Sequence, residues 1–150
     1  MVIVQKSRLV GNNIVRNYRL PIRIYYEDTD AGGVVYYANY LKFLERVRTE
    51  WLRSFGFEQD QLREQDGILF AVRSVNINYV QAARFNQQII SCVDDFSLKR
   101  ASIAVQQSIV MQDGGATVVD AEVNIVCLDC DKFSPKPIPE RLYRELLACK

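Results

Sequence analysis

Hydrophobic and polar residues along the chain follow two different periods. A short apolar run at 20–26 is typical of a strand, and the run at 27–33, Glu-Asp-Thr-Asp-Ala-Gly-Gly, is typical of a turn. From about residue 37 the apolar residues recur every three or four positions, with charged residues between them: Tyr40, Leu41, Phe43, Leu44, Val47, Trp51, Leu52 and Phe55. This spacing predicts one amphipathic helix of about five turns, which ends near Gly56.

After a polar connection at 58–67 the period changes to two, which predicts four strands: 74–79, 90–98, 103–111 and 119–127. One face of the second strand is expected to carry four apolar side chains, despite an interruption at Asp94: Ile90, Cys92, Phe96 and Leu98. Short connections at 99–100 and 113–115, without intervening helices, predict antiparallel neighbours arranged as a meander. Three prolines then precede a short amphipathic helix at 140–147.

This layout predicts an α+β fold, with one antiparallel sheet and one long helix. A single helix covers only one face of such a sheet, so the other face is left for solvent or a partner. The many apolar strand positions make a second copy of the chain a plausible partner. No repeat or linker divides the sequence, so we expect a single domain over 1–150, with 1–18 as a peripheral segment.

The composition is that of an ordinary globular protein and narrows the chemistry. Among 150 residues, 19 basic and 18 acidic side chains nearly cancel, so no global signal for nucleic-acid binding exists. The N-terminus does not resemble a signal peptide, and no apolar run approaches the roughly 18 residues that span a bilayer. We therefore expect a cytoplasmic protein without a membrane span.

Histidine is absent from the sequence, and this absence is informative. It removes Ser-His-Asp and Cys-His catalysis, histidine-dependent dehydratase chemistry and most catalytic zinc sites. Cys127 and Cys130 form a lone C-x-x-C, which we interpret as two thiols at a strand end in a reducing compartment rather than a metal or redox site. We expect no metal and no cofactor, and a catalytic base would be a carboxylate or a perturbed Lys, Tyr or Cys.

Asp28 and Asp30 lie between a strand end and a helix start, followed by Gly32 and Gly33. A calcium loop is excluded because the twelfth position from Asp28 is Asn39 rather than Glu. Two readings remain: a tight turn that caps a helix, or a catalytic loop. In the second, a carboxylate activates water or attacks a carbonyl polarised by helix N-terminal amides, and the glycines let the substrate approach the backbone.

The run from Tyr25 to Tyr37, Tyr-Tyr-Glu-Asp-Thr-Asp-Ala-Gly-Gly-Val-Val-Tyr-Tyr, closely resembles the 4-hydroxybenzoyl-CoA thioesterase family. Within that family the likeness is nearest to the acyl-CoA thioesterases associated with the Tol–Pal system, and it covers about 19–147. The resemblance implies a hot-dog fold, a sheet wrapped around one long helix, in dimers or tetramers with active sites at the dimer interface. It also implies that Asp30 is catalytic, that the Tyr37 N–H polarises the thioester carbonyl, and that Asp28 is a support residue.

Other residues carry weaker expectations. The 4-hydroxybenzoyl branch places basic residues on the CoA phosphates at a hairpin end, which here corresponds to Lys99 and Arg100. Another hot-dog branch uses a helical glutamate, which here would be Glu45, although a salt-bridge role is the preferred interpretation. The helix residues Phe43, Val47 and Trp51 are interpreted as core rather than as an acyl tunnel, whereas Tyr36 and Tyr40 are candidates for lining the acyl pocket.

Two departures from the family pattern stand out. Tol–Pal-associated members commonly carry histidine where this chain has Tyr37, and the segment 81–86 lacks the proline and aspartate often found there. The favoured hypothesis is hydrolysis of an acyl-CoA or acyl-carrier-protein thioester, with Asp30 as general base or nucleophile. The alternative is a non-catalytic acyl-binding module that docks on acyl carrier protein. The acyl group and the number of subunits remain open at this point.

Overall fold

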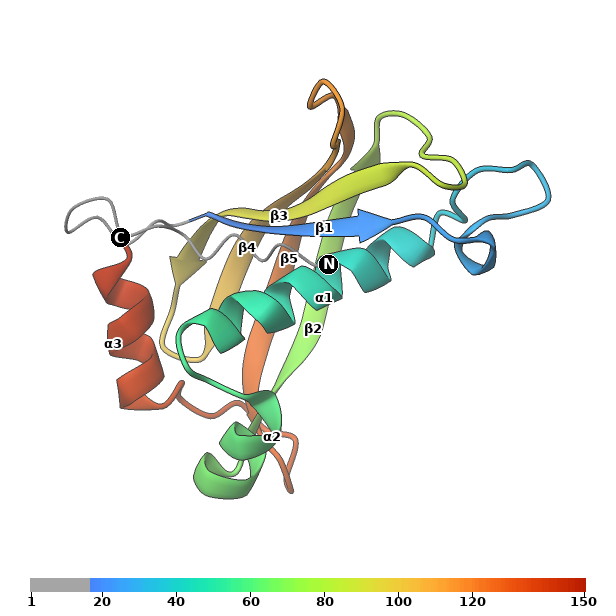
Figure 1. Ribbon diagram of the computed structural model, residues 1–150. Helices are drawn as coiled ribbons and strands as arrows, with labels where there is room; N and C mark the ends of the chain where they lie inside the picture. The colour runs from blue at the N-terminus through green and yellow to red at the C-terminus, as the bar shows by residue number, and fades with distance from the viewer. Residues whose placement is uncertain (1–16) are drawn as a thin grey trace.

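The computed structural model describes residues 17–150, in which a five-stranded antiparallel sheet curves around one long helix (Figure 1). The strands are β1 (Tyr18–Arg23), β2 (Ile68–Tyr79), β3 (Gln88–Leu98), β4 (Ser102–Met111) and β5 (Thr117–Asp129), in the order β1-β3-β4-β5-β2. The helices are α1 (Asn39–Ser54), the short α2 (Gln59–Gln61) and α3 (Glu140–Ala148), with short turns η1 (Tyr26–Asp28) and η2 (Leu62–Asp66). The predicted α+β layout is confirmed. The expected peripheral segment falls mostly on 1–16, outside the described residues, and Tyr18 already belongs to β1.

Helix α1 lies within its predicted limits and buries most of its predicted face: Tyr40, Phe43, Leu44, Val47, Trp51 and Leu52. Two positions depart from the pattern, because Leu41 is exposed whereas Arg48 is buried. The helix ends at Gly56, which adopts a φ of +87° and donates its N–H to the Arg53 carbonyl at 2.9 Å. This left-handed terminus is typical of glycine and confirms the predicted stop.

The predicted meander holds for β3, β4 and β5, which are joined by the two short connections, but it is wrong for β2. Strand β2 pairs with β5, and β1 occupies the place beside β3. The connection 80–87 is too long to form a tight hairpin and instead crosses the end of the sheet. It is held there by a hydrogen bond from Val35 N–H to the Ala83 carbonyl (2.9 Å) and by a bridge between Val34 and Arg84.

The predicted face of β3 is also wrong in its first half. The pairing of β3 with β4 shifts between Val93 and Asp95, so Asp94 is a β-bulge. A bulge moves the following residues to the opposite face relative to strict alternation. Ser91, rather than Ile90 or Cys92, therefore points to α1 and donates its hydroxyl to the Phe43 carbonyl at 3.0 Å.

The core has two clusters along α1. The first surrounds Trp51 and includes Phe96 of β3 and Leu142 and Leu146 of α3, so the predicted C-terminal helix closes that end. The second surrounds Phe43 and Leu44 and includes residues of the 24–35 loop, the 80–87 connection, β4 and β5: Ile24, Val35, Ala83, Ile109, Val118 and Val119. The second cluster anchors the loop that carries Asp28 and Asp30.

Three further observations concern the described part of the chain. No helix in it is long and apolar enough to cross a membrane. Cys92, Cys127 and Cys130 are in the thiol form, with Cys127 buried and its Sγ 3.7 Å from the Pro137 carbonyl oxygen. Within residues 17–150 no group of three or more Cys, Asp or Glu side chains is placed to hold a metal ion.

Candidate active site

The loop after β1 is folded as a small hairpin at the end of the sheet, next to the start of α1 (Figure 1). Thr29 pairs with Val35 across it, and the turn is closed by two backbone hydrogen bonds between Asp30 N–H and Val34 O (2.9 Å) and between Gly33 N–H and Asp30 O (3.0 Å). Gly33 has a φ of +76°, which favours glycine at this position. The turn exposes Asp30 at its tip.

Asp28 and Asp30 have different surroundings. The Asp28 carboxylate accepts the Tyr25 N–H at 2.8 Å, and its carbonyl accepts the Tyr36 N–H and the Asn39 side-chain amide, each at 2.9 Å. Asp28 therefore ties β1, the hairpin and α1 together. Asp30 accepts only the Gly32 N–H, at 2.8 Å through Oδ1. Its other carboxylate oxygen has no hydrogen-bond donor among residues 17–150 and faces solvent.

The Asp30 carboxylate folds back over Gly32. A Cβ at Gly32 would lie 3.1 Å from Asp30 Oδ1, which is tighter than nine in ten real Cβ contacts, so the carboxylate would have to shift by a few tenths of an ångström. Gly32 and Gly33 thus shape the hairpin that holds Asp30, in addition to leaving the backbone open to a ligand.

Tyr37 lies just before α1, across the hairpin from Asp28. Its carbonyl accepts a hydrogen bond from the Tyr79 hydroxyl at 3.2 Å. Its backbone N–H has no acceptor in the part of the chain that the structure describes. Asn39 N–H, by contrast, is used by the Tyr36 carbonyl at 2.8 Å. The amide that the family resemblance assigns to the thioester carbonyl is therefore free to donate.

The sequence is similar to those of known thioesterases. A model of the thioesterase-like superfamily matches residues 25–146. The acyl-CoA thioesterase YbgC from Haemophilus influenzae is 37% identical over 125 residues, which cover 83% of this chain and 90% of that protein. The chain belongs to the thioesterase-like superfamily.

Solved structures from this superfamily share the architecture. A probable thioesterase from Bartonella henselae has a TM-score of 0.76 at 31% identity, covering 82% of this chain and 99% of that one. A 1,4-dihydroxy-2-naphthoyl-CoA thioesterase from Synechocystis has a TM-score of 0.80 at 15% identity, with 87% and 96% covered. The predicted hot-dog fold is confirmed, and so is the resemblance to this group of thioesterases.

Aromatic side chains pack around the loop of this thioesterase-like protein. The Tyr37 and Tyr79 rings meet edge to face with centroids 6.2 Å apart, and the Tyr79 and Tyr40 centroids are 5.8 Å apart. The Tyr40 hydroxyl accepts the Ala83 N–H at 3.1 Å, and burial raises the pKa of this phenol. Tyr40 thus anchors the 80–87 segment rather than offering an open pocket wall. Tyr36 stays exposed, and Phe43, Val47 and Trp51 lie in the core as predicted.

Lys99 and Arg100 lie far from Asp30 within one chain. They form the β3–β4 turn, where Lys99 N–H donates to the Ser102 carbonyl, at the opposite end of β3 from the loop that carries Asp30. A role on CoA phosphates at this chain's own Asp30 is therefore not supported by their position. Two arginines lie beside the loop: Arg23, which donates to the Asn86 carbonyl at 2.7 Å, and Arg84, whose backbone forms a bridge with Val34.

A groove of about 530 Å³ lies between α1 and the edge strand β2. Its lining combines apolar and charged side chains: Leu41, Lys42, Glu45, Arg46, Arg48, Val72, Val75 and Val123. Sequence reasoning missed both the groove and the burial of Arg48. One sequence feature could have indicated the burial of Arg48: it lies four residues after Leu44 and three before Trp51, at the border of the apolar stripe.

Proposed function

We propose that the protein hydrolyses acyl-CoA thioesters to a carboxylic acid and free CoA. In this proposal the Asp30 carboxylate is the general base for water or the nucleophile, and the Tyr37 N–H donates to the thioester carbonyl. The observation that supports it is that the short segment 30–37 carries both an exposed carboxylate, held through one oxygen, and a backbone N–H without an acceptor among the described residues. Acyl transfer needs these two parts.

The proposal gives each neighbouring residue a role. Asp28 keeps the hairpin in place through its bonds to Tyr25, Tyr36 and Asn39. The Tyr79 hydroxyl on the Tyr37 carbonyl orients the following peptide unit. The N-terminal end of α1 adds a partial positive charge that favours a developing oxyanion. Gly32 and Gly33 leave room for the substrate to approach this backbone.

We further propose that the protein self-associates through β2 and acts in the cytoplasm. Strand β2 is an edge strand of 12 residues with exposed apolar side chains, including Val72 at 51%, Val75 at 39% and Tyr79 at 46%. Long apolar edges are normally covered, and a second copy would cover this one. Thiols at Cys92, Cys127 and Cys130 fit a reducing compartment.

The first experiment follows thiol release from short, long and aromatic acyl-CoAs with the wild type and Asp30→Asn. We expect turnover of at least one thioester, and a loss of about 100- to 10,000-fold in the variant, the scale of a positioned acid–base group. Asp113→Asn removes an equally exposed carboxylate from the β4–β5 turn and should leave the rate unchanged. Equal rates for Asp30→Asn and wild type would remove Asp30 from the mechanism.

Two extensions separate the alternatives. If both proteins are inactive, the same assay is repeated with acyl carrier protein thioesters. No turnover of those thioesters would favour an acyl-binding module. Single turnover in oxygen-18 water tests the nucleophilic role of Asp30. Label in the Asp30 carboxylate indicates a mixed anhydride opened by water at the aspartyl carbon and excludes simple general base catalysis. Label only in the product acid fits general base catalysis and also water attack on the acyl carbon of an anhydride.

A further inference from the structure

Two consecutive peptide units lie at the start of α1, one between Tyr36 and Tyr37 and one between Tyr37 and Ala38. In the first, the Tyr36 carbonyl accepts the Asn39 N–H at 2.8 Å. In the second, the Tyr37 carbonyl accepts the Tyr79 hydroxyl at 3.2 Å. Neither the Tyr37 N–H nor the Ala38 N–H has an acceptor among residues 17–150. Both peptide units are therefore held through their carbonyl oxygen, and both keep an N–H to donate.

These two N–H groups point in nearly the same direction. The bond from Asn39 N–H to the Tyr36 carbonyl closes a turn over 36–39, and Ala38 has a φ of −72° and a ψ of −20°, which makes it a type I turn. Leu41 N–H donates to the Ala38 carbonyl at 3.2 Å and continues this turn into α1. In helical backbone the N–H groups point back along the axis, so both donors are directed toward the end of the molecule where the hairpin lies (Figure 1).

The same turn is tied to the hairpin that carries Asp30. The Tyr36 N–H and the Asn39 side-chain amide both donate to the Asp28 carbonyl, at 2.9 Å each. The carboxylate and the two N–H groups therefore belong to one hydrogen-bonded unit over 28–39. Acyl-transfer sites commonly use two N–H donors for the oxyanion, held in a fixed relation to the nucleophile or base.

Tyr79 is suited to hold the second of these peptide units. Its ring lies edge to face with Tyr37, with centroids 6.2 Å apart, and its centroid is 5.8 Å from that of Tyr40. Burial raises the pKa of this phenol, so the hydroxyl stays protonated and donates. The Tyr37 carbonyl and the Ala38 N–H share one peptide unit. A hydrogen bond on that carbonyl fixes the unit and, by polarising it, strengthens the Ala38 N–H as a donor.

We propose that the Ala38 N–H is a second oxyanion donor beside the Tyr37 N–H, and that Tyr79 is the residue that positions it. This inference rests on the proposed thioesterase function. An oxygen of water or of Asp30 bonds to the thioester carbon, and the electron pair of the C=O bond moves to the oxygen that both N–H groups stabilise. The C=O bond then re-forms, the C–S bond breaks, and the CoA thiolate takes up the water proton from Asp30 or a proton from solvent.

Tyr79→Phe tests the positioning role, because it keeps the ring contacts and removes only the hydroxyl. We expect kcat to fall by about 3- to 10-fold, the scale of one neutral hydrogen bond, with KM within about two-fold of wild type. Tyr37 and Tyr79 are 60% and 46% exposed, so water replaces the lost hydroxyl and the melting temperature should change little. Tyr143→Phe removes a half-buried phenol hydroxyl from α3 and is the matched control.

The donor itself is tested by replacing Ala38 with lactic acid through nonsense suppression. The resulting ester keeps the methyl side chain and lacks the N–H, so kcat should fall by about 100-fold or more, the effect of removing one oxyanion donor. Adding Tyr79→Phe to the ester protein should cause no further loss, because both changes act through one peptide unit. An equal further loss in the ester protein would make Tyr79 a structural residue and overturn its positioning role.

Infrared spectroscopy gives a readout that does not need turnover. In the Asp30→Asn protein, a bound thioester with a carbon-13 carbonyl should show a stretching frequency lowered by both donors, and Tyr79→Phe should raise it partway back. An unchanged frequency, a wild-type kcat for Tyr79→Phe, or a loss confined to KM would overturn the inference while the wild type remains active. Wild-type inactivity on every thioester would instead overturn the proposed function, and with it the reaction that the two donors serve.

Discussion

At the scale of single residues, Asp28 and Asp30 lie in one short loop but differ in their hydrogen bonds, which suits them to different roles. Asp28 accepts from Tyr25 and, through its carbonyl, from Tyr36 and Asn39, so it is committed to holding the loop. Asp30 keeps one carboxylate oxygen open to solvent. A nucleophile or base needs such an open oxygen, and a support residue does not.

The Tyr37 amide gives a residue-level prediction. Tyr37→Pro deletes the N–H, and we expect a loss of about 100- to 1000-fold in kcat, the usual effect of removing one oxyanion donor. Proline is tolerated near helix starts, so the melting temperature should change little. Tyr37→His keeps the amide and should stay within a few-fold of the wild-type kcat. If the histidine variant loses as much as the proline variant, the phenol rather than the amide carries the effect.

The candidate catalytic residues come from the sequence, whereas their surroundings do not. The residue types of the D-x-D-x-G-G run suit both a turn and acyl-transfer chemistry, and the family resemblance makes Asp30 the candidate within it. The Tyr37 N–H lacks an acceptor among the described residues because of the path of the backbone, and no residue pattern predicts that path. The distance of Lys99 from Asp30 and the burial of Arg48 depend on strand order and on packing between α1 and β4, which local periodicity does not determine.

At the scale of elements, α1 was predictable because its apolar residues repeat every three or four positions. The buried face of β3 was not predictable, because the extra residue Asp94 reverses the alternation of inward and outward side chains. The pairing of β2 with β5 was not predicted either, since the path of the segment 80–87 is fixed by contacts with the distant residues Val34 and Val35.

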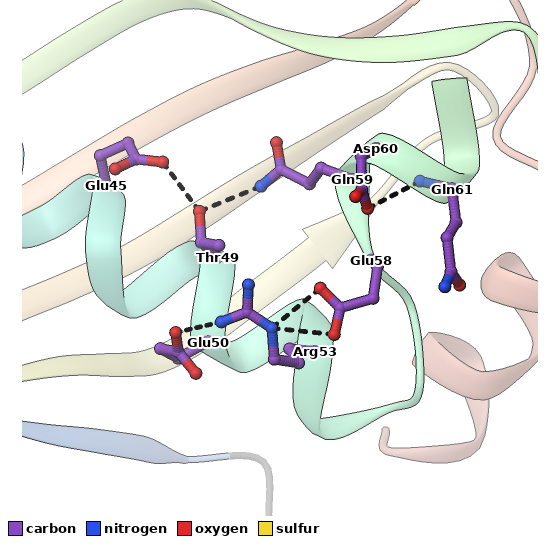
Figure 2. A network of polar contacts seen from close by, with 8 residues as sticks. All are labelled: Glu45, Thr49, Glu50, Arg53, Glu58, Gln59, Asp60 and Gln61. Atoms are coloured by element: carbon purple, nitrogen blue, oxygen red, sulfur yellow. Dashed lines mark hydrogen bonds and ion pairs between the residues drawn. The ribbon is translucent and has the colours of Figure 1, made fainter. Parts of the chain in front are cut away.

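Helix α1 is expected to owe its stability to its buried face. Leu44 is fully buried, so Leu44→Ala should cost about 2–5 kcal/mol. Arg53 contacts Glu50 and Glu58 in the network of Figure 2, but its side chain is 45% exposed. Arg53→Ala should therefore cost no more than about 1 kcal/mol, and less in high salt. Urea unfolding of both variants measures the difference, and an Arg53→Ala loss as large as that of Leu44→Ala would contradict this account.

At the scale of the whole molecule, the two edges of the sheet differ. Strand β1 offers six residues that include Pro21, which cannot donate to a further strand. Strand β2 offers 12 residues and carries exposed apolar side chains beside the groove. The β1 edge is thus poorly suited to pairing with a further strand, whereas the β2 edge is well suited to it. The sequence predicted that one face of the sheet would be left for solvent or a partner. That β2 is the edge open to pairing follows only from the strand order.

Val72→Lys tests self-association through this edge. Val72 is 51% exposed on β2, and a lysine there would set two like charges close together in a two-fold pairing of β2 strands. We expect the variant to move toward monomer in analytical ultracentrifugation, with an equilibrium shifted by about 10-fold or more, since like-charge contacts cost several kcal/mol. Leu147→Lys makes the same kind of change at a 51% exposed site on α3 and should leave the mass unchanged. A wild-type monomer, or a Val72→Lys protein that assembles like wild type, would show that β2 is not the contact.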